Sequence, residues 1–447
     1  MNSFLNIIKL FESEQSRTVP ELSKFYDNRD LLIHFITQVS KNWLNENNLS
    51  GKRVLLKPNW VRNSWRPTDT ICLRTNDNFI LAALEVVLIG KPSEVTIGDA
   101  PIQGCSWDKM ITVAFLGEVR KLSEMYNIPV KIKDFRRVTF NPALNKVDAE
   151  LNPLSNYTIF DLGTNSYLEP ITSKKKNLFR VTQYNPDRFI ESHNPGVHKY
   201  CLTNDLFDSD VIISLPKIKT HQKAGITGAL KNLVGLNGDK DYLPHHRLGG
   251  TDRGGDCYPG HNLLRHWAEI FQDKANRKIG KSIYWFWLRL SSVSWRLSLP
   301  KNVHHLGAAW YGNDTTWRMV MDLNRIAYYG KKDGEIAKEP QRLIFSLCDG
   351  IIGGQGDGPL NPEPLPLGLI SFSNDSALND ISMATLMGID YKKLPLLVAA
   401  EKFNPKNKPS VYLNGILTNQ IDLKQLSINA KMPPGWIDYQ MLTNLKQ

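Results

Sequence analysis

A strand, a helix and a second strand follow one another between residues 53 and 101, and this β–α–β pattern restricts the fold more than any other feature. The first apolar run, residues 54–56, stops before a proline, which cannot donate a hydrogen bond within a sheet. A helical pattern over residues 76–89 leads to the second run, residues 94–97. Strands joined in this way are parallel, with a right-handed crossover. We therefore predict an α/β protein with a mostly parallel sheet.

Polar residues follow both of these predicted strands. Lys57 and Asn59 come directly after the first, and Asp99 follows the second. The carboxyl ends of parallel strands meet at one edge of the sheet, where open α/β proteins bind ligands. These three residues are therefore candidates for a ligand site. The alternative is ordinary turn chemistry at the strand ends.

A third apolar run, residues 211–215, precedes a cationic loop and the start of a helix. The candidates for binding in this segment are Lys217, Lys219, His221, Gly228, Lys231 and Asn232. Free N–H groups at a helix start, its positive dipole end and nearby ammonium groups all favour an anion. The alternative is an ordinary connection with solvated lysines. We predict a site for a small anionic ligand here.

A loop with little apolar content follows and carries two adjacent histidines. His245 or His246 can join His221 as an acid–base group or a metal ligand, because neutral imidazole suits both roles near neutral pH. The alternative is that the adjacent histidines are simply exposed. The predicted catalytic residues are His221, Lys231, His245 and His246, and the predicted metal ligands are His221, His246 and Asp349.

A glycine-rich segment follows the predicted strand at residues 343–347. We expect a loop here that lets a ligand approach the backbone closely. Its candidate binding residues are Gly353, Gly354, Gly356 and Asp357. Either Asp349 or Asp357 is suited to a divalent ion. The segment lacks the Gly-Lys-Ser/Thr ending of a phosphate loop and the helix that follows a dinucleotide fingerprint.

The predicted organisation has three parts. Residues 1–50 form a helical extension, residues 51–390 an α/β core, and residues 391–447 a cap. The core has two lobes of mixed or mostly parallel sheet flanked by helices, with a ligand cleft between them. Insertions interrupt it at about 137–205 and 266–300.

Composition excludes several classes of protein. The formal charge of +11 is spread along the chain, and no nucleic-acid-binding motif accompanies it, so no nucleic acid partner is expected. The five cysteines lack metal-binding spacing, so no iron–sulfur cluster is expected. No apolar run approaches the roughly 20 residues of a spanning helix. We predict a cytoplasmic protein and leave its oligomeric state open.

Residues 284–295 combine aromatic and basic side chains at helical spacing. Such a helix can lie in a membrane interface beside anionic lipid. The alternative is an insertion that packs its aromatic rings on the protein body or in a dimer interface. Peripheral membrane contact through 284–295 is one prediction for the partners of this chain.

Five motifs together resemble a bacterial and archaeal family of unknown function, number 362 in its series. They are VLLKPN, GDAP, LPKIKTHQKAGITGALKNLVG, GNDTTWRMVMDLNR and DGIIGGQGDGP, spread over residues 50–390. Many members of that family carry an added iron–sulfur module. This chain lacks the cysteine cluster of that module.

The segment from His221 through Gly228 to Lys231 also resembles a segment of the nickel-dependent lactate racemases. In those enzymes a lysine anchors a nickel-pincer nucleotide and histidines act as metal ligand and acid–base pair. The resemblance implies that Lys231 is the anchor and His221 the neighbouring histidine. Here Ala229 replaces one of the paired glycines, and Asn232 follows the lysine.

Two functions follow from these features. The first is an enzyme that binds a small anionic or hydroxylated substrate, aided by a divalent metal or a nucleotide-derived cofactor, with isomerase or redox chemistry implied by the resemblance. The second is a non-catalytic anion or nucleotide binder that serves as an accessory factor, for example in cell-surface polysaccharide assembly.

Overall fold

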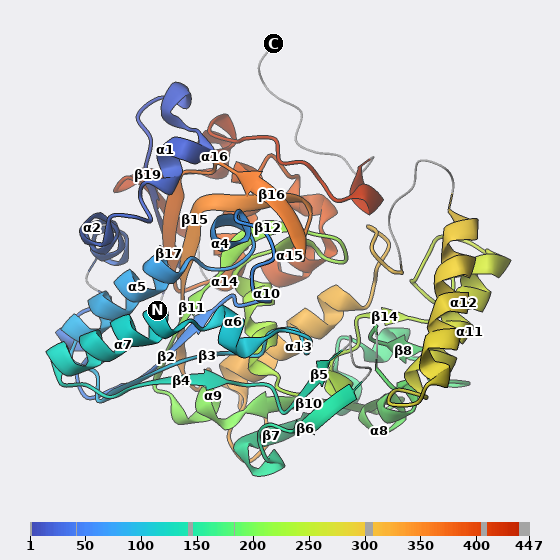
Figure 1. Ribbon diagram of the computed structural model, residues 1–447. Coiled ribbons are helices and arrows are strands. Elements are labelled where there is room, and N and C mark those ends of the chain that lie inside the picture. Colours follow the sequence, from blue (N-terminus) through green and yellow to red (C-terminus); the bar gives the residue numbers. More distant parts are fainter. Residues whose placement is uncertain are drawn as a thin grey trace.

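A large mixed sheet with helices on both faces forms the body of the protein (Figure 1). The computed structural model describes residues 2–41, 43–141, 146–182, 184–299, 307–403 and 409–437. In this part of the chain the sheet has twelve strands. Nine of them run side by side in the order β19 (Ile416–Thr418), β18 (Ser410–Leu413), β1 (Phe4–Lys9), β17 (Leu369–Ser373), β15 (Leu343–Asp357), β11 (Val211–Leu215), β2 (Arg53–Pro58), β3 (Glu94–Asp99) and β4 (Val130–Asp134).

The five strands from β15 to β4 are parallel to their neighbours, as predicted. β17 is antiparallel to both β15 and β1, and β18 is parallel to β1. Three further strands attach to the carboxyl end of β15 or to each other: β12 (Lys217–His221), β13 (Gly225–Thr227) and β16 (Asn361–Leu365). The predicted α/β class with a mostly parallel sheet is confirmed.

Alternate residues of each central strand enter two separate hydrophobic cores. In β11, Val211, Ile213 and Leu215 enter one core, and Ile212 enters the other. The first core also contains the apolar sides of α2 (Arg29–Ser40), α5 (Asp77–Ile89) and α7 (Val113–Tyr126). The second contains those of α13 (Thr316–Tyr329), α14 (Ser376–Leu386) and α15 (Pro395–Glu401). The period of two along each strand therefore produces a helix–sheet–helix sandwich.

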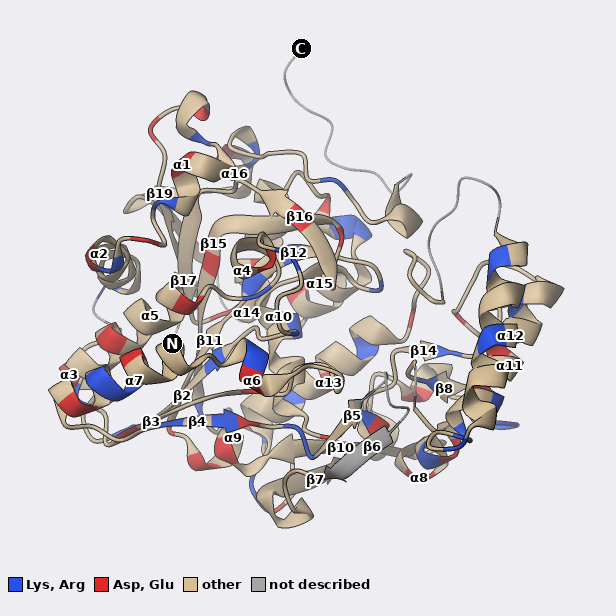
Figure 2. Ribbon diagram, in the orientation of Figure 1, with Lys and Arg blue, Asp and Glu red and all other residues tan. Residues whose placement is uncertain are grey.

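Short helices occupy the connections. They are α1 (Val19–Ser23), α3 (Glu46–Leu49), α4 (Asp69–Cys72), α6 (Trp107–Met110), α8 (Phe189–Ser192), α9 (Asn204–Asp208), α10 (Ala229–Asn232) and α16 (Gln420–Gln425). Positive and negative side chains are distributed over most elements, as Figure 2 shows.

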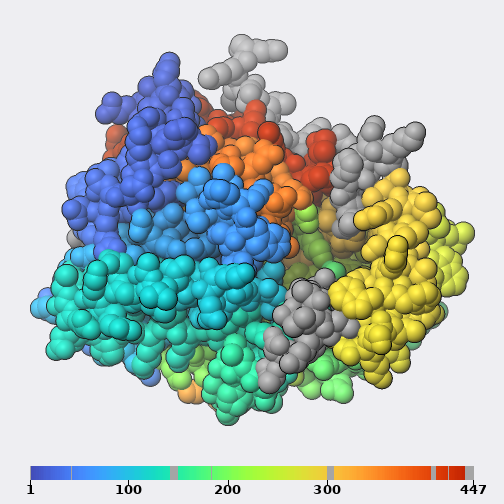
Figure 3. All heavy atoms as spheres, in the orientation of Figure 1, coloured from blue at the N-terminus to red at the C-terminus, as the bar shows by residue number. Residues whose placement is uncertain are grey.

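Three small antiparallel sheets lie below and to the right of the main one in Figure 1. Their strands are β5 (Val138–Asn141) with β6 (Lys146–Glu150), β8 (Phe179–Arg180) with β14 (His246–Arg247), and β7 (Tyr157–Asp161) with β10 (Val197–Thr203) and β9 (His193–Asn194). Two helices, α11 (Leu263–Asn276) and α12 (Ile283–Ser298), form a hairpin at the edge of the molecule. Figure 3 shows a hollow between this yellow hairpin and the orange segment, with green spheres at its bottom.

Two expectations about local structure are wrong. The glycine-rich segment is a continuation of β15, paired with β16, because the glycines pack against neighbouring chain. A Cβ on Gly354 would lie 2.7 Å from the Lys219 Cβ. The segment 4–9, expected to be helical, is strand β1, whose buried Leu5 and Ile7 lie between two other strands. The expected helix in the N-terminal part is present as α2.

Among the described residues, no helix has both the length and the apolar character needed to cross a membrane.

Candidate functional site

The ends of β2 and β3 meet in a buried ion pair. The Lys57 Nζ lies 2.7 Å from the Asp99 Oδ1, and both side chains are almost completely buried. Lys57 also donates to the Asn232 Oδ1 at 3.3 Å. Burial lowers the pKa of Lys57, and the Asp99 carboxylate opposes this shift. The two strand-end residues are brought together as predicted, and each neutralises the other.

Gly235 leaves the space that this ion pair occupies. A Cβ at Gly235 would lie 1.8 Å from the Asp99 Oδ1 and 2.8 Å from the Lys57 Nζ. The Gly235 carbonyl also accepts a hydrogen bond from the Ala100 N–H at 2.9 Å. The Gly235 backbone therefore lies so close to the Lys57–Asp99 pair that no side chain fits at this position.

The predicted binding residues of β12, Lys217 and Lys219, also have partners within the protein. Lys217 pairs with Asp349 at 2.9 Å, and both side chains are fully buried. Tyr26 donates to the Asp349 Oδ1 at 2.6 Å and accepts from Lys217 at 2.9 Å. The Asn76 N–H donates to the second Asp349 oxygen at 3.1 Å. Both oxygens of Asp349 are thus used within the protein.

Lys219 and Asn59 form a second internal connection. Lys219 donates to the Asn59 Oδ1 at 3.0 Å and to the Leu73 carbonyl. The Asn59 amide donates to Asn232, whose own amide donates to the Lys57 carbonyl at 2.9 Å. These residues therefore connect β2, β12 and α10 to each other.

The start of α10, which we predicted to bind an external anion, is capped by a carboxylate from α14. Asp380 accepts hydrogen bonds from the Ala229 N–H at 2.6 Å and the Leu230 N–H at 2.9 Å. A Cβ at Gly228 would lie 2.2 Å from the Asp380 Oδ1, so this carboxylate lies where a side chain would otherwise be. The four-residue helix offers little dipole in any case. The prediction of an external anion at this helix start is wrong.

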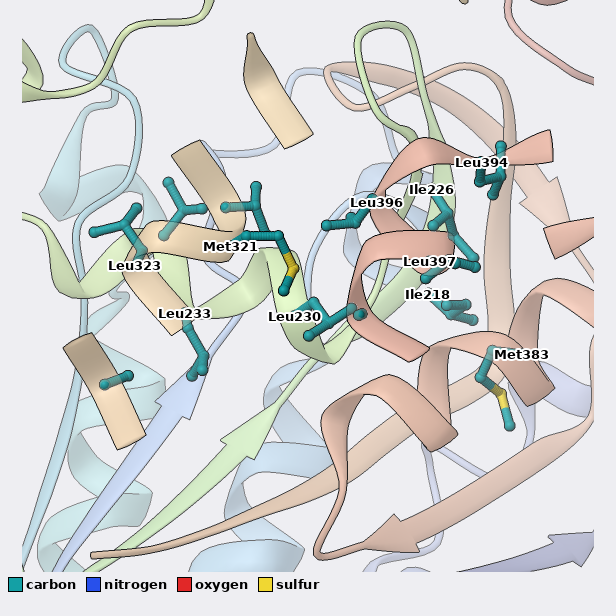
Figure 4. Close-up of a cluster of buried hydrophobic side chains, with 14 of the residues drawn as sticks. Ile218, Ile226, Leu230, Leu233, Met321, Leu323, Met383, Leu394, Leu396 and Leu397 are labelled. Atoms are coloured by element: carbon teal, nitrogen blue, oxygen red, sulfur yellow. The ribbon is translucent and has the colours of Figure 1, made fainter. Parts of the chain in front are cut away.

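Apolar contacts hold α10 in place. Leu230 is buried between α13 and the helices α14 and α15, and Leu233, just after α10, is buried beside α13, as Figure 4 shows. Lys231, which follows Leu230 in the helix, is partly buried. Packing of its neighbours therefore fixes the position of the lysine backbone.

Lys231 belongs to a group of basic side chains that we call the cationic cluster. Its members are Lys223, Lys231, Lys240, His221 and His245. Among the described residues, the Lys231 ammonium makes no hydrogen bond or ion pair, whereas Lys240 donates to the Ala100 carbonyl at 3.2 Å. Burial, followed by the charges of Lys240 and Lys223, lowers the pKa of Lys231 to about 8.

His221 has one ring nitrogen fixed by the backbone. Its Nδ1 accepts hydrogen bonds from the Lys223 N–H at 3.0 Å and the Ala224 N–H at 3.2 Å. In the neutral ring, the proton is therefore assigned to Nε2. Burial first, and then the charge of Lys231, lowers the pKa of His221 well below its ordinary value.

His245 has the opposite arrangement. Its Nδ1 lies 2.7 Å from the Leu243 carbonyl, which can only accept, so the ring proton is assigned to Nδ1 and the lone pair to Nε2. Burial, then Lys223 and Lys231, lowers the pKa of His245 well below its ordinary value. The structure therefore brings together three of the four predicted catalytic residues, Lys231, His221 and His245.

The fourth, His246, lies on β14, where the charge of Arg180 acts on it together with those of Lys223 and His245. Its Nδ1 is buried and has no hydrogen-bond partner among the described residues. Burial and then Lys223 lower its pKa well below the ordinary value. Within the described part of the chain, no close group of potential ligand atoms unites His246 with His221 and Asp349, so this predicted metal set is not assembled.

The glycine-rich strand lies beside β12 but makes internal contacts. Gly353 and Gly354 pair with β16, and a Cβ on Gly353 would lie 2.7 Å from Leu367. Gly356 has a φ of +73°, and Asp357 accepts a hydrogen bond from Gln222. Gly353 and Gly354 are therefore explained by close packing within the protein, since a side chain at either position would clash with neighbouring residues.

The residues present do not fit the nickel-pincer nucleotide implied by the resemblance. Lys231 offers a free amine, yet Asp380 occupies the helix start beside it, and the predicted metal ligands do not meet. We therefore derive no step through that cofactor.

Fold and site together define a mixed α/β protein with a partly buried cationic cluster at the carboxyl edge of its sheet. The family described as "Domain of unknown function (DUF362)" matches residues 164–385. The chain resembles this family over those residues, and the resemblance predicted from its motifs is confirmed. The match includes all five residues of the cationic cluster.

The chain is also similar to three individual proteins. It is 22% identical over 204 residues to Thylakoid-associated protein sll1697 from Synechocystis sp. (strain ATCC 27184 / PCC 6803 / Kazusa), covering 45% of this chain and 40% of that protein. The chain thus matches about two fifths of that relative's length. A crystal structure of a Thermotoga maritima protein has a TM-score of 0.37 and 9% identity, covering 85% of this chain and 59% of that one.

The lactate racemase apoprotein from Thermoanaerobacterium thermosaccharolyticum has a TM-score of 0.28 and 11% identity, covering 71% of this chain and 48% of that one. Structural likenesses this low carry no argument about the site.

Proposed function

We propose that this protein is an enzyme that binds a small carboxylate- or phosphate-bearing molecule at the cationic cluster and moves a proton on it. One observation carries the proposal: His221 is buried, Lys231 and His245 are partly buried, and none of the three pairs with a carboxylate among the described residues. The side-chain charges that most affect the pKa values of these three groups all belong to lysines and histidines. Buried charge of one sign is costly, and a bound anion supplies the missing charge.

The two histidines offer complementary hydrogen bonding to such an anion. His221 presents a neutral N–H, and His245 presents a lone pair, as their backbone contacts determine. A neutral imidazole N–H can polarise a carbonyl or carboxylate oxygen, and an imidazole lone pair can accept a proton from the adjacent carbon. A donor on His221 and an acceptor on His245 together favour removal of a proton from the carbon next to a carboxylate, as in an isomerisation.

Lys231 has a pKa suited to both binding and proton transfer. With its pKa lowered to about 8, most of it is ammonium at neutral pH, while the free amine is readily accessible. A bound anion offsets the positive field and raises the pKa values of Lys231 and His245 toward their ordinary values. The base therefore becomes stronger when substrate is present.

Binding is tested with inorganic phosphate and oxalate by thermal unfolding and calorimetry. We expect both anions to raise the melting temperature of the wild-type protein and to have no such effect on Lys231→Met. Lys331→Met, which removes an exposed lysine paired with Glu335 at 3.3 Å, is the matched control and keeps the effect. An equal response of wild type and Lys231→Met overturns the assignment of the anion to this cluster.

Catalysis is tested by incubating short 2-hydroxy and 2-keto carboxylates in D₂O and following their C–H signals by NMR. We expect deuterium to enter the carbon beside the carboxylate of at least one compound. His245→Gln is expected to lower this exchange at least about 100-fold. His34→Gln, which changes an exposed histidine of α2, leaves it unchanged. Anion binding without exchange in wild type favours the non-catalytic binder instead.

A second proposal concerns the surface of the α11–α12 hairpin, which we propose lies against an anionic lipid membrane. Among residues 261–299, both acidic side chains, Glu269 and Asp273, are buried. The exposed charged residues of this segment are therefore all basic. Exposed apolar side chains accompany them, including Trp267, Phe286 and Leu297, at 50%, 54% and 69% exposure. This combination suits a lipid interface, and the name of the Synechocystis relative associates that protein with a membrane.

Liposome flotation tests this surface. We expect the protein to float with phosphatidylglycerol vesicles at low salt, and less with phosphatidylcholine vesicles or at high salt. Phe286→Ser combined with Leu297→Ser abolishes flotation. Ile416→Ser combined with Leu417→Ser removes two side chains that are equally exposed in β19 and preserves it. Equal flotation of both double variants contradicts the proposal.

A further inference from the structure

A second cluster of side chains, separate from the cationic cluster, has the donor atoms of a transition-metal site. His246 on β14, Cys257 in the following loop and Glu269 on α11 each offer one ligand atom, and these atoms all lie within 4.8 Å of one another. All three residues are buried. Nitrogen, thiolate sulfur and carboxylate oxygen are together the ligands preferred by Zn²⁺, and Mg²⁺ and Ca²⁺ favour oxygen alone.

The surroundings orient these side chains. Both Glu269 oxygens accept a hydrogen bond from the Gly249 N–H, at 3.1 and 3.0 Å. The Cys257 backbone is held on both sides, by the Gly249 carbonyl at 3.0 Å and the Ala308 N–H at 2.8 Å. Asp273, one turn after Glu269, is engaged by Arg180 and so is not a further ligand. Such outer contacts position metal ligands in proteins.

Two features indicate that the cluster binds something. The Nδ1 of His246 is a buried nitrogen without a partner among the described residues, which is costly unless a ligand satisfies it. A cavity of about 290 Å³ adjoins the cluster and is lined by His246, Cys257 and Glu269 together with Arg180 and Trp295. Three protein ligands beside a cavity leave a fourth position for water or another small group.

We propose that His246, Cys257 and Glu269 form a binding site for Zn²⁺ or a chemically similar divalent transition metal. In a tetrahedral zinc site the ligand atoms are about 3.3–3.8 Å apart, so binding draws these three together by up to about 1.5 Å. The metal links β14 to α11 and so fastens the hairpin to the body. None of its ligands belongs to the cationic cluster, so the site stands independently of the proposed reaction.

Metal binding is measured on the full-length protein after treatment with a chelator and reloading with Zn²⁺ or Co²⁺. We expect about one equivalent of either metal, and a thiolate-to-cobalt charge-transfer absorption with Co²⁺. Cys257→Ser loses the absorption, and Glu269→Gln weakens binding at least about 10-fold. Cys105→Ser, a buried cysteine elsewhere, retains both signals. Wild-type protein that binds less than about 0.1 equivalent, or a Cys257→Ser variant that keeps the absorption, overturns the site.

A second measurement needs no variant. The alkylation rate of Cys257 is followed by peptide mass spectrometry in the wild-type protein with and without Zn²⁺. We expect Zn²⁺ to slow it at least about 10-fold and to leave the rate at Cys105 unchanged. Equal rates at Cys257 with and without Zn²⁺ contradict the proposal.

Discussion

Asp380 accepts a hydrogen bond from the Leu230 backbone N–H at 2.9 Å, across 150 residues of sequence. Its other oxygen accepts from the Ala229 N–H at 2.6 Å. This carboxylate both begins α10 and occupies the position that an external anion would take. The anion site is consequently defined by side chains, with Lys231 at its centre.

Replacing Asp380 with Asn is expected to lower the free energy of unfolding by about 1–3 kcal/mol, because one of the two acceptor oxygens becomes an N–H₂ donor facing a backbone N–H. Denaturant titration measures this change. Asp390→Asn alters a cap at the surface and is expected to cost less than about 1 kcal/mol. Equal costs for the two variants would show that burial of the Asp380 contacts is unimportant.

Lys231→Met is expected to stabilise the free protein in a pH-dependent way. The pKa of Lys231 is lowered from 10.5 to about 8, so between these values the unfolded chain binds the extra proton, and wild-type stability rises with pH. Below pH 8 the penalty of the buried charge is fully present. Below pH 8 the free energy of unfolding of the variant should exceed that of wild type by on the order of 2 kcal/mol, and above about pH 10.5 the two should be equal.

Unfolding free energies of wild type, Lys231→Met and Lys331→Met at several pH values between 6.5 and 10.5 test this. The control should follow the wild-type curve. Parallel curves for wild type and Lys231→Met would contradict the lowered pKa.

Lys217→Met is expected to be strongly destabilising although Lys217 was predicted to bind a ligand. It leaves the buried Asp349 carboxylate without its charge partner, at a cost of about 3–5 kcal/mol. Lys431→Met breaks an exposed pair with Glu363 and should cost less than about 1 kcal/mol. A wild-type melting temperature for Lys217→Met would exclude a structural role for this pair.

Gly235→Ala is expected to cost more than about 2 kcal/mol, because the added methyl group would lie 1.8 Å from the Asp99 Oδ1 and force the Lys57–Asp99 pair apart. Gly117→Ala in α7 places the same group in open space and should stabilise the protein by about 0.5–1 kcal/mol. Thermal and chemical unfolding of both variants measure these changes. Similar stability of the two variants would contradict the crowding at Gly235.

The parallel part of the fold was predictable because its signals are local. Apolar runs, a proline stop and a helical pattern identified β2, α5 and β3, and their order determined the direction of the strands. The course of β15 was not predictable in this way. Its glycines fit a loop equally well, and only their contacts with Lys219 and Leu367 across the fold show why they lie in a strand.

The candidate site was likewise predictable only where its signals are local in the sequence. Lys231, His221 and His245 were found because basic residues cluster in short stretches of sequence. Lys217 lies in the same kind of stretch, but it forms a buried ion pair with Asp349, 132 residues further on. Asp380, Gly235 and Cys257 were missed for the same reason: nothing in their own neighbourhood indicates the distant group that each one contacts.

Strand β1 lies between β17 and β18, and Ser3 beside it donates to Asp375, 372 residues later. A ribosome adds about 5–20 residues per second, so β1 is made roughly 20–70 s before its first partner strand. During synthesis the apolar residues Leu5 and Ile7 therefore remain without the strands that bury them. The sheet can close around β1 only after β17 and β18 have been made, and until then the apolar side of β1 is open to aggregation.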